Sequence, residues 1–249
     1  MMDISIPRVL EKLDAYLGKN QYRAAERHLR YWLAEADALG DSRSAFAILN
    51  ELIGLYRKCE MKEEGLNACE RTLALVREMG IGDSAGAATA YINAATAYKS
   101  FGMPEEALPL YKQAKVIYER EVGDERLAGL YNNMAVTLAD LSKPGQAMEL
   151  YERALLILKE QEGSEPEQAV TFLNMADLVN RESGPEAGEE KIVTYLKEAE
   201  TLLDRAWDKD KSPNYAFVAE KCAPVFRYYG SFMTAKKLEE RAGRIRKAL

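Results

Sequence analysis

The sequence predicts an all-α fold, a right-handed solenoid of antiparallel helical hairpins, on three observations. Residues 91–123 recur at an offset of 40 residues as 131–163. Apolar residues in both copies recur at helical spacing, and a proline stands at the expected start of the second helix in each copy. A repeat of this length indicates an array of stacked units rather than one compact core. The matching residues include Tyr91 and Tyr131, Asn93 and Asn133, Ala95 and Ala135, Pro104 and Pro144, Ala107 and Ala147, Tyr111 and Tyr151, and Gly123 and Gly163.

The third repeat shows how each hairpin is expected to form. A first helix over 84–101 places Tyr91, Ala94, Ala95 and Tyr98 on one buried face. Gly102 can take the left-handed conformation that ends a helix, and Pro104 suits the first turn of the next one. The second helix then buries a face made of Ala107, Leu110, Tyr111, Ala114 and Ile117.

Small residues at one position extend the pattern to four secure repeats. Ala25, Gly65, Ala107 and Ala147 follow one another at spacings of 40, 42 and 40 residues. The repeats are therefore expected over 5–40, 43–82, 84–123 and 125–163. A fifth repeat, 166–207, combines a first helix over 171–179, an unusually long turn over 182–188 and a second helix over 192–203.

The last repeat, 213–249, is expected to end the array. Its helices span 215–229 and 234–248, with Gly230 between them. Terminal units of such arrays need a polar outer face, and the last helix is charged everywhere outside one apolar face. Alanine makes that face too thin for a membrane-surface helix, so a capping helix is predicted. Its apolar residues are Ala235, Leu238, Ala242, Ile245 and Leu249.

Composition supports a folded chain and limits its partners. The chain is 47% apolar and 30% charged, which is enough to bury a core. No Pro/Gly/Ser-rich linker interrupts the repeats, so one continuous domain over 1–249 is predicted. A net charge of -6 argues against a nucleic-acid partner, because such partners select basic surfaces.

The ends and cysteines indicate a cytoplasmic protein. Residues 1–7 lack the basic and apolar regions of a signal peptide, and no stretch of about 18 apolar residues could span a membrane. The cysteines, Cys59, Cys69 and Cys222, are odd in number and form no C-x-x-C pair. Reduced thiols are the simplest interpretation.

The repeats described above resemble those of the tetratricopeptide repeat family. Its signature is a small residue and an aromatic in the first helix, a glycine, and an alanine followed by an aromatic in the second. The period of 40 to 44 residues exceeds the usual 34, and the surplus extends the second helix over 116–120 and 156–160. The sequence is similar to the longer repeats of kinesin light chains and of bacterial peptide-sensing regulators. The signature residues here are Ala95, Tyr98, Gly102, Ala107, Tyr111 and Ala114.

The regulator function is not carried over from this resemblance. Such regulators usually place a helix-turn-helix DNA-binding domain before the repeats, whereas the first repeat here is expected within about ten residues of Met1. The two-carboxylate clamp of chaperone-binding members is not expected either, because it needs a pair of lysines that this sequence does not match.

The resemblance implies a binding groove lined by the first helices. In the family, the residue just before the packed small pair points into a concave groove, and here that residue is Asn93, Asn133 and Asn174. An asparagine amide both donates and accepts hydrogen bonds, so the three could hold the backbone of an extended peptide. The alternative is that each asparagine only bonds to a neighbouring helix.

Residues further along the same helical faces differ between repeats. This is expected of a surface that combines a general backbone contact with specific side-chain recognition. Nearby positive charge from Arg57, Lys99 and Arg227 would suit an acidic or free-carboxylate peptide, although exposed charge on helices is commonly only solvated. The varied positions are Thr96 and Ser100, Val136 and Asp140, Asp177 and Arg181, and, after Glu51, Gly54 and Lys58.

No enzyme, cofactor or metal site is expected. The sole histidine, His28, lies in a polar stretch and is predicted at the surface. No zinc-protease, phosphate-loop, dinucleotide or nucleophile-elbow motif occurs, and the tyrosines fall mainly at packing positions such as Tyr56, Tyr98, Tyr111 and Tyr151. The function predicted is a scaffold for a protein or peptide partner. The alternative is a module for oligomerisation or docking through its edges and convex face, suggested by the irregular fifth repeat and the loop 208–214.

Overall fold

The structure, a computed structural model, describes residues 4–122, 126–209 and 211–248. Within these residues the chain forms twelve α-helices, one π-helical turn and no strand, which confirms the predicted all-α class. The chain divides into two compact units, unit 1 over residues 1–122 and unit 2 over 123–249. The division coincides with the expected junction of the third and fourth repeats. One continuous domain stays a prediction, and Gly123, the repeat start at 125, Asp210 of the loop and Leu249 of the last helix lie outside the described residues.

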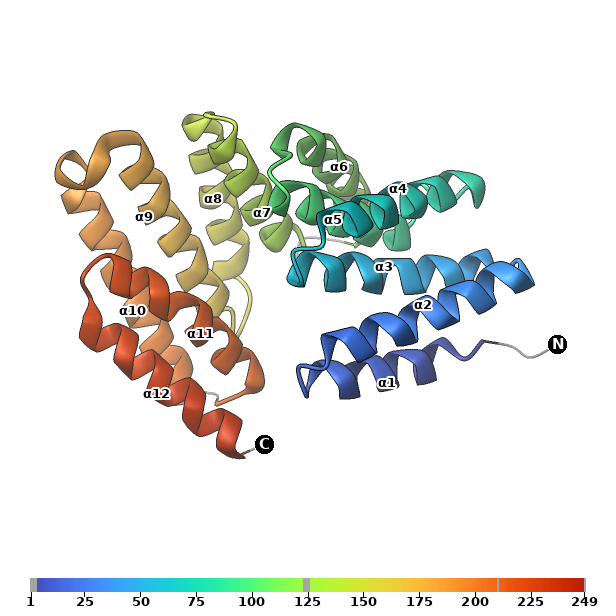
Figure 1. Cartoon of the computed structure of the whole chain (residues 1–249). Helices are drawn as coiled ribbons and strands as arrows, with labels where there is room; N and C mark the ends of the chain where they lie inside the picture. The colour runs from blue at the N-terminus through green and yellow to red at the C-terminus, as the bar shows by residue number, and fades with distance from the viewer. Residues whose placement is uncertain (1–3, 123–125, 210, 249) are drawn as a thin grey trace. The chain divides into compact units, whose positions relative to one another are not determined.

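Unit 1 consists of three antiparallel hairpins (Figure 1). They pair α1 (Ile6–Leu17) with α2 (Tyr22–Leu39), α3 (Ser42–Lys58) with α4 (Lys62–Glu78), and α5 (Ala85–Ser100) with α6 (Pro104–Ile117). The predicted extension of the second helix is present as a π-helical turn, η1 (Tyr118–Val122), after α6. An apolar cluster from Val9 to Ala97 connects these helices.

Unit 2 repeats this arrangement with three further hairpins. They pair α7 (Leu127–Asp140) with α8 (Pro144–Lys159), α9 (Glu165–Ala187) with α10 (Glu189–Lys209), and α11 (Pro213–Tyr228) with α12 (Phe232–Ala248) (Figure 1). An apolar cluster from Ala169 to Ile245 includes both helices of the last hairpin. Helix α12 buries Ala235, Leu238, Ala242 and Ile245 as expected of a capping helix.

The third hairpin has a capped first helix and the predicted glycine after it. The Ser84 side chain accepts the Ala87 N–H at the start of α5, and Gly102 follows α5 with φ 78°. The small positions Ala25, Ala107 and Ala147 are fully buried. Gly65 holds the same position on α4, where a Cβ atom would lie 2.7 Å from two ring atoms of Phe101.

The predicted long turn in the fifth repeat is wrong. Helix α9 continues to Ala187 and is broken only at Gly184, which has φ 75° and ψ 168°. Helix α10 begins two residues later, at Glu189. The cluster of glycine and proline in 182–188 therefore marks a sharp break rather than a loop, because Gly184 can adopt a conformation closed to other residues and Pro185 can begin a helical turn.

The prediction that His28 is a surface residue is also wrong. Its ring is half-buried, and Nε2 donates to the backbone oxygen of Val9 on α1 at 3.0 Å. The ring also meets Tyr16 edge-on, with centroids 5.8 Å apart. Burial of Tyr56, Tyr111 and Tyr151 is confirmed, whereas Tyr98 is half-buried. None of the described helices is long and apolar enough to span a membrane.

Candidate functional site

The first helices of hairpins α7–α8 and α9–α10 present two of the predicted asparagines at the surface of unit 2. Asn133 on α7 is exposed and Asn174 on α9 is half-buried. Each stands on the face opposite the packed alanines Ala135 and Ala176, which are fully buried. Among the described residues, neither amide side chain has a hydrogen-bond partner. Both are therefore available to bond an incoming chain.

Asn174 lines a small pocket of about 50 Å³ between α7 and α9. This volume suits a methyl group or one or two water molecules. The pocket gathers Asn174, Asp177 and Arg181, three residues that the sequence predicted to act together. Its other lining residues are Val136, Ala139, Tyr151 and Leu178.

The charged groups at this pocket already have partners. Arg181 Nη1 donates to Asp140 Oδ1 at 2.8 Å, which connects α9 to α7. That hydrogen bond raises the pKa of Arg181. The Tyr229 hydroxyl donates to Asp177 Oδ1 at 2.7 Å, which connects α11 to α9. These bonds fix the charged side chains, whereas the Asn174 amide has no hydrogen-bond partner among the described residues.

The third predicted asparagine, in unit 1, is held by a neighbouring helix. Asn93 Nδ2 on α5 donates to Asn50 Oδ1 on α3 at 3.1 Å, and Asn50 Nδ2 donates to the Phe46 carbonyl at 2.9 Å. Thr96 shares a hydrogen bond of 2.9 Å with the Tyr111 hydroxyl. Exposed Ser100 donates to the Ala97 carbonyl. Asn93 therefore has a structural bond, with its Oδ1 and second N–H still to be used.

A comparable bond in unit 2 involves a residue that the sequence did not single out. Asn132 on α7 donates to Thr171 Oγ1 on α9 at 2.9 Å and also to the Ala128 carbonyl. Its Oδ1 is buried without a partner among the described residues. The bonded asparagine, Asn132, directly precedes the unbonded one, Asn133, so the two roles fall on adjacent positions.

The predicted basic residues are dispersed. Arg57 and Lys58 are exposed in the last turn of α3, where the helix dipole favours positive charge. The Lys58 ammonium lies 4.9 Å from the ring centroid of Tyr22, and Lys99 is half-buried near the end of α5. Arg227 on α11 pairs with Glu239 on α12. Their assignment to a binding site stays a prediction.

The structure shows that Lys221 holds the asparagine position in the last hairpin. A residue with positive φ follows α5, α7 and α11, namely Gly102, Ser142 and Gly230. The residues nine positions before these are Asn93, Asn133 and Lys221. The position of Gly230 in the sequence could have identified Lys221, but the irregular pattern of the last repeats made it hard to align the last hairpin with the earlier ones.

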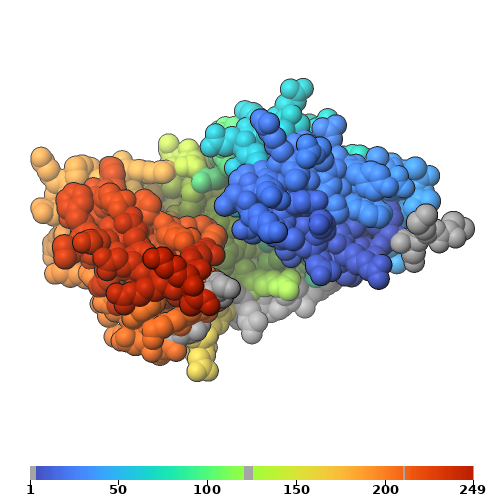
Figure 2. Space-filling model, turned by 60° about the horizontal axis from the view of Figure 1, so that its bottom comes forward, coloured from blue at the N-terminus to red at the C-terminus, as the bar shows by residue number. Residues whose placement is uncertain are grey.

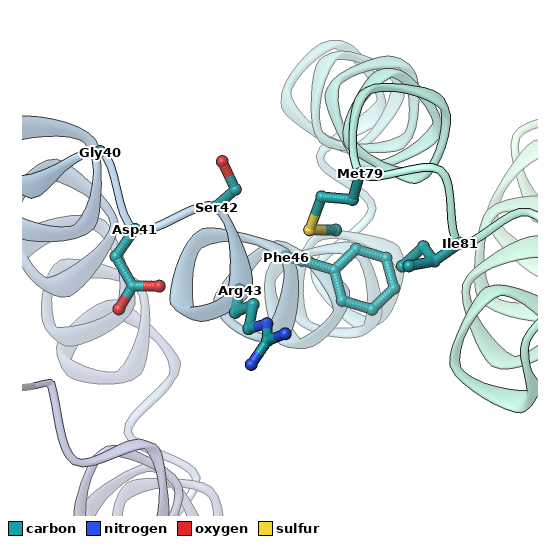
Figure 3. Close-up of a pocket in the computed structure, with 7 residues that line it drawn as sticks. All are labelled: Gly40, Asp41, Ser42, Arg43, Phe46, Met79 and Ile81. Carbon is teal, nitrogen blue, oxygen red and sulfur yellow. The ribbon is translucent and has the colours of Figure 1, made fainter.

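A larger pocket of about 500 Å³ lies at the helix turns of unit 1 (Figure 3). Figure 3 shows Phe46, Met79 and Ile81 gathered at one side and the Arg43 side chain nearby. The Asp41 carboxylate accepts the Ser44 N–H, and hydrogen bonds from Ser44 hold the pKa of Asp41 below its usual value. None of the predicted site residues lines this pocket. Its remaining lining residues are Gly40 and Ser42.

Comparison with protein families finds the repeats that the hairpins and their signature residues suggest. Residues 44–120 and 127–164 match tetratricopeptide repeat models. The chain therefore contains tetratricopeptide repeats over these residues. Neither match indicates an enzyme family, and a search of the curated proteins found no match.

Solved structures of similar fold include the two kinds of long-repeat protein that the sequence resembles. BtubC (BKLC) from P. vanneervenii is 25% identical, with a TM-score of 0.65 and coverage of 81% of this chain and 78% of that one. A putative kinesin light chain from Podosopora anserina is 17% identical, with a TM-score of 0.51 and coverage of 80% and 93%. NprR in complex with its cognate peptide NprX is 16% identical, with a TM-score of 0.59 and coverage of 97% and 68%. The last two likenesses concern the fold.

Proposed function

We propose that this protein is an interaction scaffold whose first helices bind an extended peptide segment of a partner protein. The observation that carries the proposal is the pair of unpaired amides, Asn133 and Asn174, on the neighbouring helices α7 and α9. Each amide can donate to a peptide carbonyl and accept from a peptide N–H. Two such contacts would hold an extended backbone whatever its side chains.

The surroundings of these amides favour binding with little rearrangement. Asp140, Asp177 and Arg181 are fixed by the bonds between α7, α9 and α11. A surface fixed before binding loses less conformational entropy when the ligand arrives. The pocket beside Asn174 could hold one small side chain of the peptide.

Two further points support a peptide ligand. In unit 1, Asn93 keeps an acceptor and one N–H after its bond to Asn50, so it can add a similar contact there. A protein of similar fold, NprR, has been solved with its cognate peptide.

Substitution of the two unpaired amides tests the proposal. Dodecapeptides would be selected from a random display library on the intact chain, synthesised with a fluorescein label, and titrated by fluorescence anisotropy. Asn133→Ala with Asn174→Ala should weaken binding about tenfold or more, since each net hydrogen bond contributes about 0.5–1.5 kcal/mol. Asn67→Ala is a matched control, because Asn67 is exposed on the second helix α4. Unchanged affinity in the double variant would end the proposal.

Docking through the edges or outer face is the second candidate, and two observations favour it. The 500 Å³ pocket lies at the helix turns of unit 1, and none of the predicted asparagines lines it. The second helices expose Val116 (59%) on α6 and Leu156 (65%) on α8, which occupy equivalent positions in their repeats. If Phe46→Ser, Val116→Ser or Leu156→Ser abolishes partner capture while the asparagine variant keeps it, this second function applies. Loss of self-association in sedimentation experiments with the same variants would identify an oligomerisation module.

A further inference from the structure

Helix α11 carries an exposed row of side chains that the binding proposal has not used. Phe217, Lys221, Pro224 and Tyr228 follow one another at spacings of 4, 3 and 4 residues, so they share one face of the helix. All four are exposed, with Phe217 at 49% and Tyr228 at 71%. At a rise of about 1.5 Å per residue the row is about 16 Å long. We call these four residues the α11 row.

The α11 row lies open between two neighbouring helices. On one side, Asn180 Nδ2 of α9 donates to the Tyr228 hydroxyl at 3.4 Å. On the other side, Glu220 pairs with Arg246 of α12 and Arg227 pairs with Glu239 of α12. Figure 2 shows α11 and α12, in orange-red and red, forming much of the visible surface of unit 2.

Lys221 is the charged group of α11 that has no counter-ion in the part of the chain that the structure describes. The helix carries three charged residues, of which Glu220 and Arg227 are paired with α12. No acidic side chain pairs with Lys221 among the described residues. Its ammonium lies 4.2 Å from the ring centroid of Phe217, a cation–π contact that holds the charge over the aromatic face. Lys221 is thus a positioned cation in a chain of net charge -6.

The row combines this cation with apolar surface in both directions along the helix. Phe217 lies on one side of Lys221, and Pro224 and Tyr228 lie on the other. A bound chain would therefore continue past Lys221 in both directions, which favours an internal acidic side chain over a chain end. A single lysine also suits one carboxylate better than a phosphate, whose binding sites commonly use forked arginines.

We propose that the α11 row binds an acidic residue of the extended peptide, with its carboxylate at Lys221 and apolar neighbours against Phe217 and Tyr228. The inference rests on the proposed function, because Lys221 takes the place that asparagine holds in the preceding hairpins. About five residues of extended chain cover the row at 3.3 Å per residue. The recognised pattern is a glutamate or aspartate flanked on both sides by apolar residues.

The test uses the intact chain and the amidated, fluorescein-labelled dodecapeptides selected on it. We expect the selected peptides to contain an acidic residue between apolar ones. Replacing that glutamate or aspartate by glutamine or asparagine gives the amide peptide. This change should weaken binding about fivefold, the effect of an exposed ion pair of about 1 kcal/mol. Lys221→Met should remove this difference between acid and amide peptides, and Lys221→Arg should keep it. Phe217→Ser should weaken both peptides alike.

Controls separate this contact from folding and from the asparagine contacts. Lys12→Met removes another lysine that lies over an aromatic ring, Tyr16 at 5.1 Å on α1, and should leave the acid preference unchanged. Lys221 is exposed, so Lys221→Met should keep the urea midpoint of the parent chain. The double variant of Asn133 and Asn174 should weaken acid and amide peptides by the same factor.

Four results would overturn the inference, and they are distinguishable. If the acid and amide peptides differ in affinity by the same factor for the parent chain and for Lys221→Met, the proposed contact at α11 is wrong while the asparagine proposal stands. Binding that is lost in the amidated peptides and restored by the same peptides with a free C-terminal carboxylate would replace the internal acidic residue with a chain end. A dimer that dissociates on Phe217→Ser and Tyr228→Ser would mean that a second copy covers the row. Failure to select any peptide would remove both this inference and the proposed function.

Discussion

Asparagine occupies two different settings on the first helices, and their energetics differ. Asn93 bonds to Asn50 on the next helix, whereas Asn133 is exposed without a side-chain partner among the described residues. Alanine at either position gains the same intrinsic helix preference, a few tenths of a kcal/mol. Only the Asn93 substitution also removes a bond between two helices.

We therefore expect Asn93→Ala to be less stable than Asn133→Ala by about 1 kcal/mol, the net contribution of one hydrogen bond. Urea unfolding followed by circular dichroism at 222 nm would measure the difference. Equal stabilities would show that the Asn93–Asn50 bond contributes nothing, and that both asparagines are available for a ligand.

The cysteines should differ sharply in reactivity. Burial raises the pKa of Cys69 and of Cys222 to about 12, so both thiols stay protonated and covered at pH 8. Cys59 is half-buried, and burial raises its pKa as well. With a chromogenic disulfide reagent at pH 8, we expect one slow reacting thiol in the native chain and three after denaturation. Cys59→Ser should remove the native reaction, and a native count of two or three would contradict the burial.

At this scale, the sequence predicted packing better than polar contacts. The helical spacing of tyrosine and alanine located buried positions such as Tyr111 and Ala95, because the buried face of a helix repeats at intervals of three to four residues that are visible in the sequence. Hydrogen bonds between repeats have no such period. Asn50 stands one place before the pattern position held by Glu51, and His28 directly follows the charged residues Glu26 and Arg27 although its ring faces α1. Their partners become known only when neighbouring helices are placed in space.

At the scale of the element, the break in α9 depends on one glycine. Gly184 has φ 75° and ψ 168°, a region that is costly for residues with a Cβ atom. Gly184→Ala should therefore destabilise the chain by about 1–3 kcal/mol. Gly243 in α12 is the matched control, because it is helical and a Cβ there meets no atom within 4 Å. Gly243→Ala should stabilise by up to about 1 kcal/mol, and equal effects of the two in thermal unfolding would refute this view of the break.

Helices α10 and α12 are joined by an ionic cluster that should make stability depend on pH. Lys237 Nζ lies 2.8 Å from Glu200 and 3.1 Å from Asp204. Arg241 Nη1 lies 2.6 Å from Asp204 Oδ1 and also donates to the Tyr215 hydroxyl. Burial acts to raise the pKa of Asp204, but the hydrogen bonds from Arg241 and Lys237 outweigh it and lower the pKa.

The sign of the pH effect follows from this lowered pKa. The stabilisation is fully present above the unfolded-state pKa of about 3.9, and it is lost as pH falls through the lower folded-state pKa. Asp204→Asn should cost about 1 kcal/mol at pH 7, given that the cluster is partly exposed, and progressively less below pH 4. Urea midpoints at pH 7 and pH 3 would measure this. Asp208→Asn, an exposed position on the same helix, should show no such loss, and a gap for Asp204→Asn that persists at pH 3 would contradict the cluster's role.

Helix boundaries were predictable where two repeats share the same sequence pattern, and they were not predictable where a repeat departs from that pattern. Pro104 and Pro144 located the second helices of two repeats correctly. In the fifth repeat the same residue types, Gly184 and Pro185, break a helix that then resumes. Glycine and proline mark a change of backbone direction, but not how many residues that change takes. For the same reason the register of the last repeat was uncertain, and Lys221 was missed.

At the scale of the whole molecule, the chain has two compact units where the sequence predicts one continuous domain. Repeat arrays are stabilised mainly by contacts between neighbouring repeats, so a division between the third and fourth hairpins needs no linker to mark it. Each unit has its own buried apolar cluster, and each contains one of the chain's two tryptophans. Trp32 packs against the cluster of unit 1 and Trp207 against that of unit 2.

These two tryptophans allow the units to be followed separately in the intact chain. Leu203 is fully buried in unit 2, and Leu203→Ala should cost about 2–5 kcal/mol. If the units unfold separately, the urea transition reported by Trp207, measured with Trp32→Phe, should move to lower urea. The transition reported by Trp32, measured with Trp207→Phe, should stay nearly in place. Leu52→Ala in unit 1, where Leu52 is 2% exposed, should give the opposite result. Equal movement of both reporters in both variants would instead show a single cooperative domain, as the uninterrupted repeat pattern predicts.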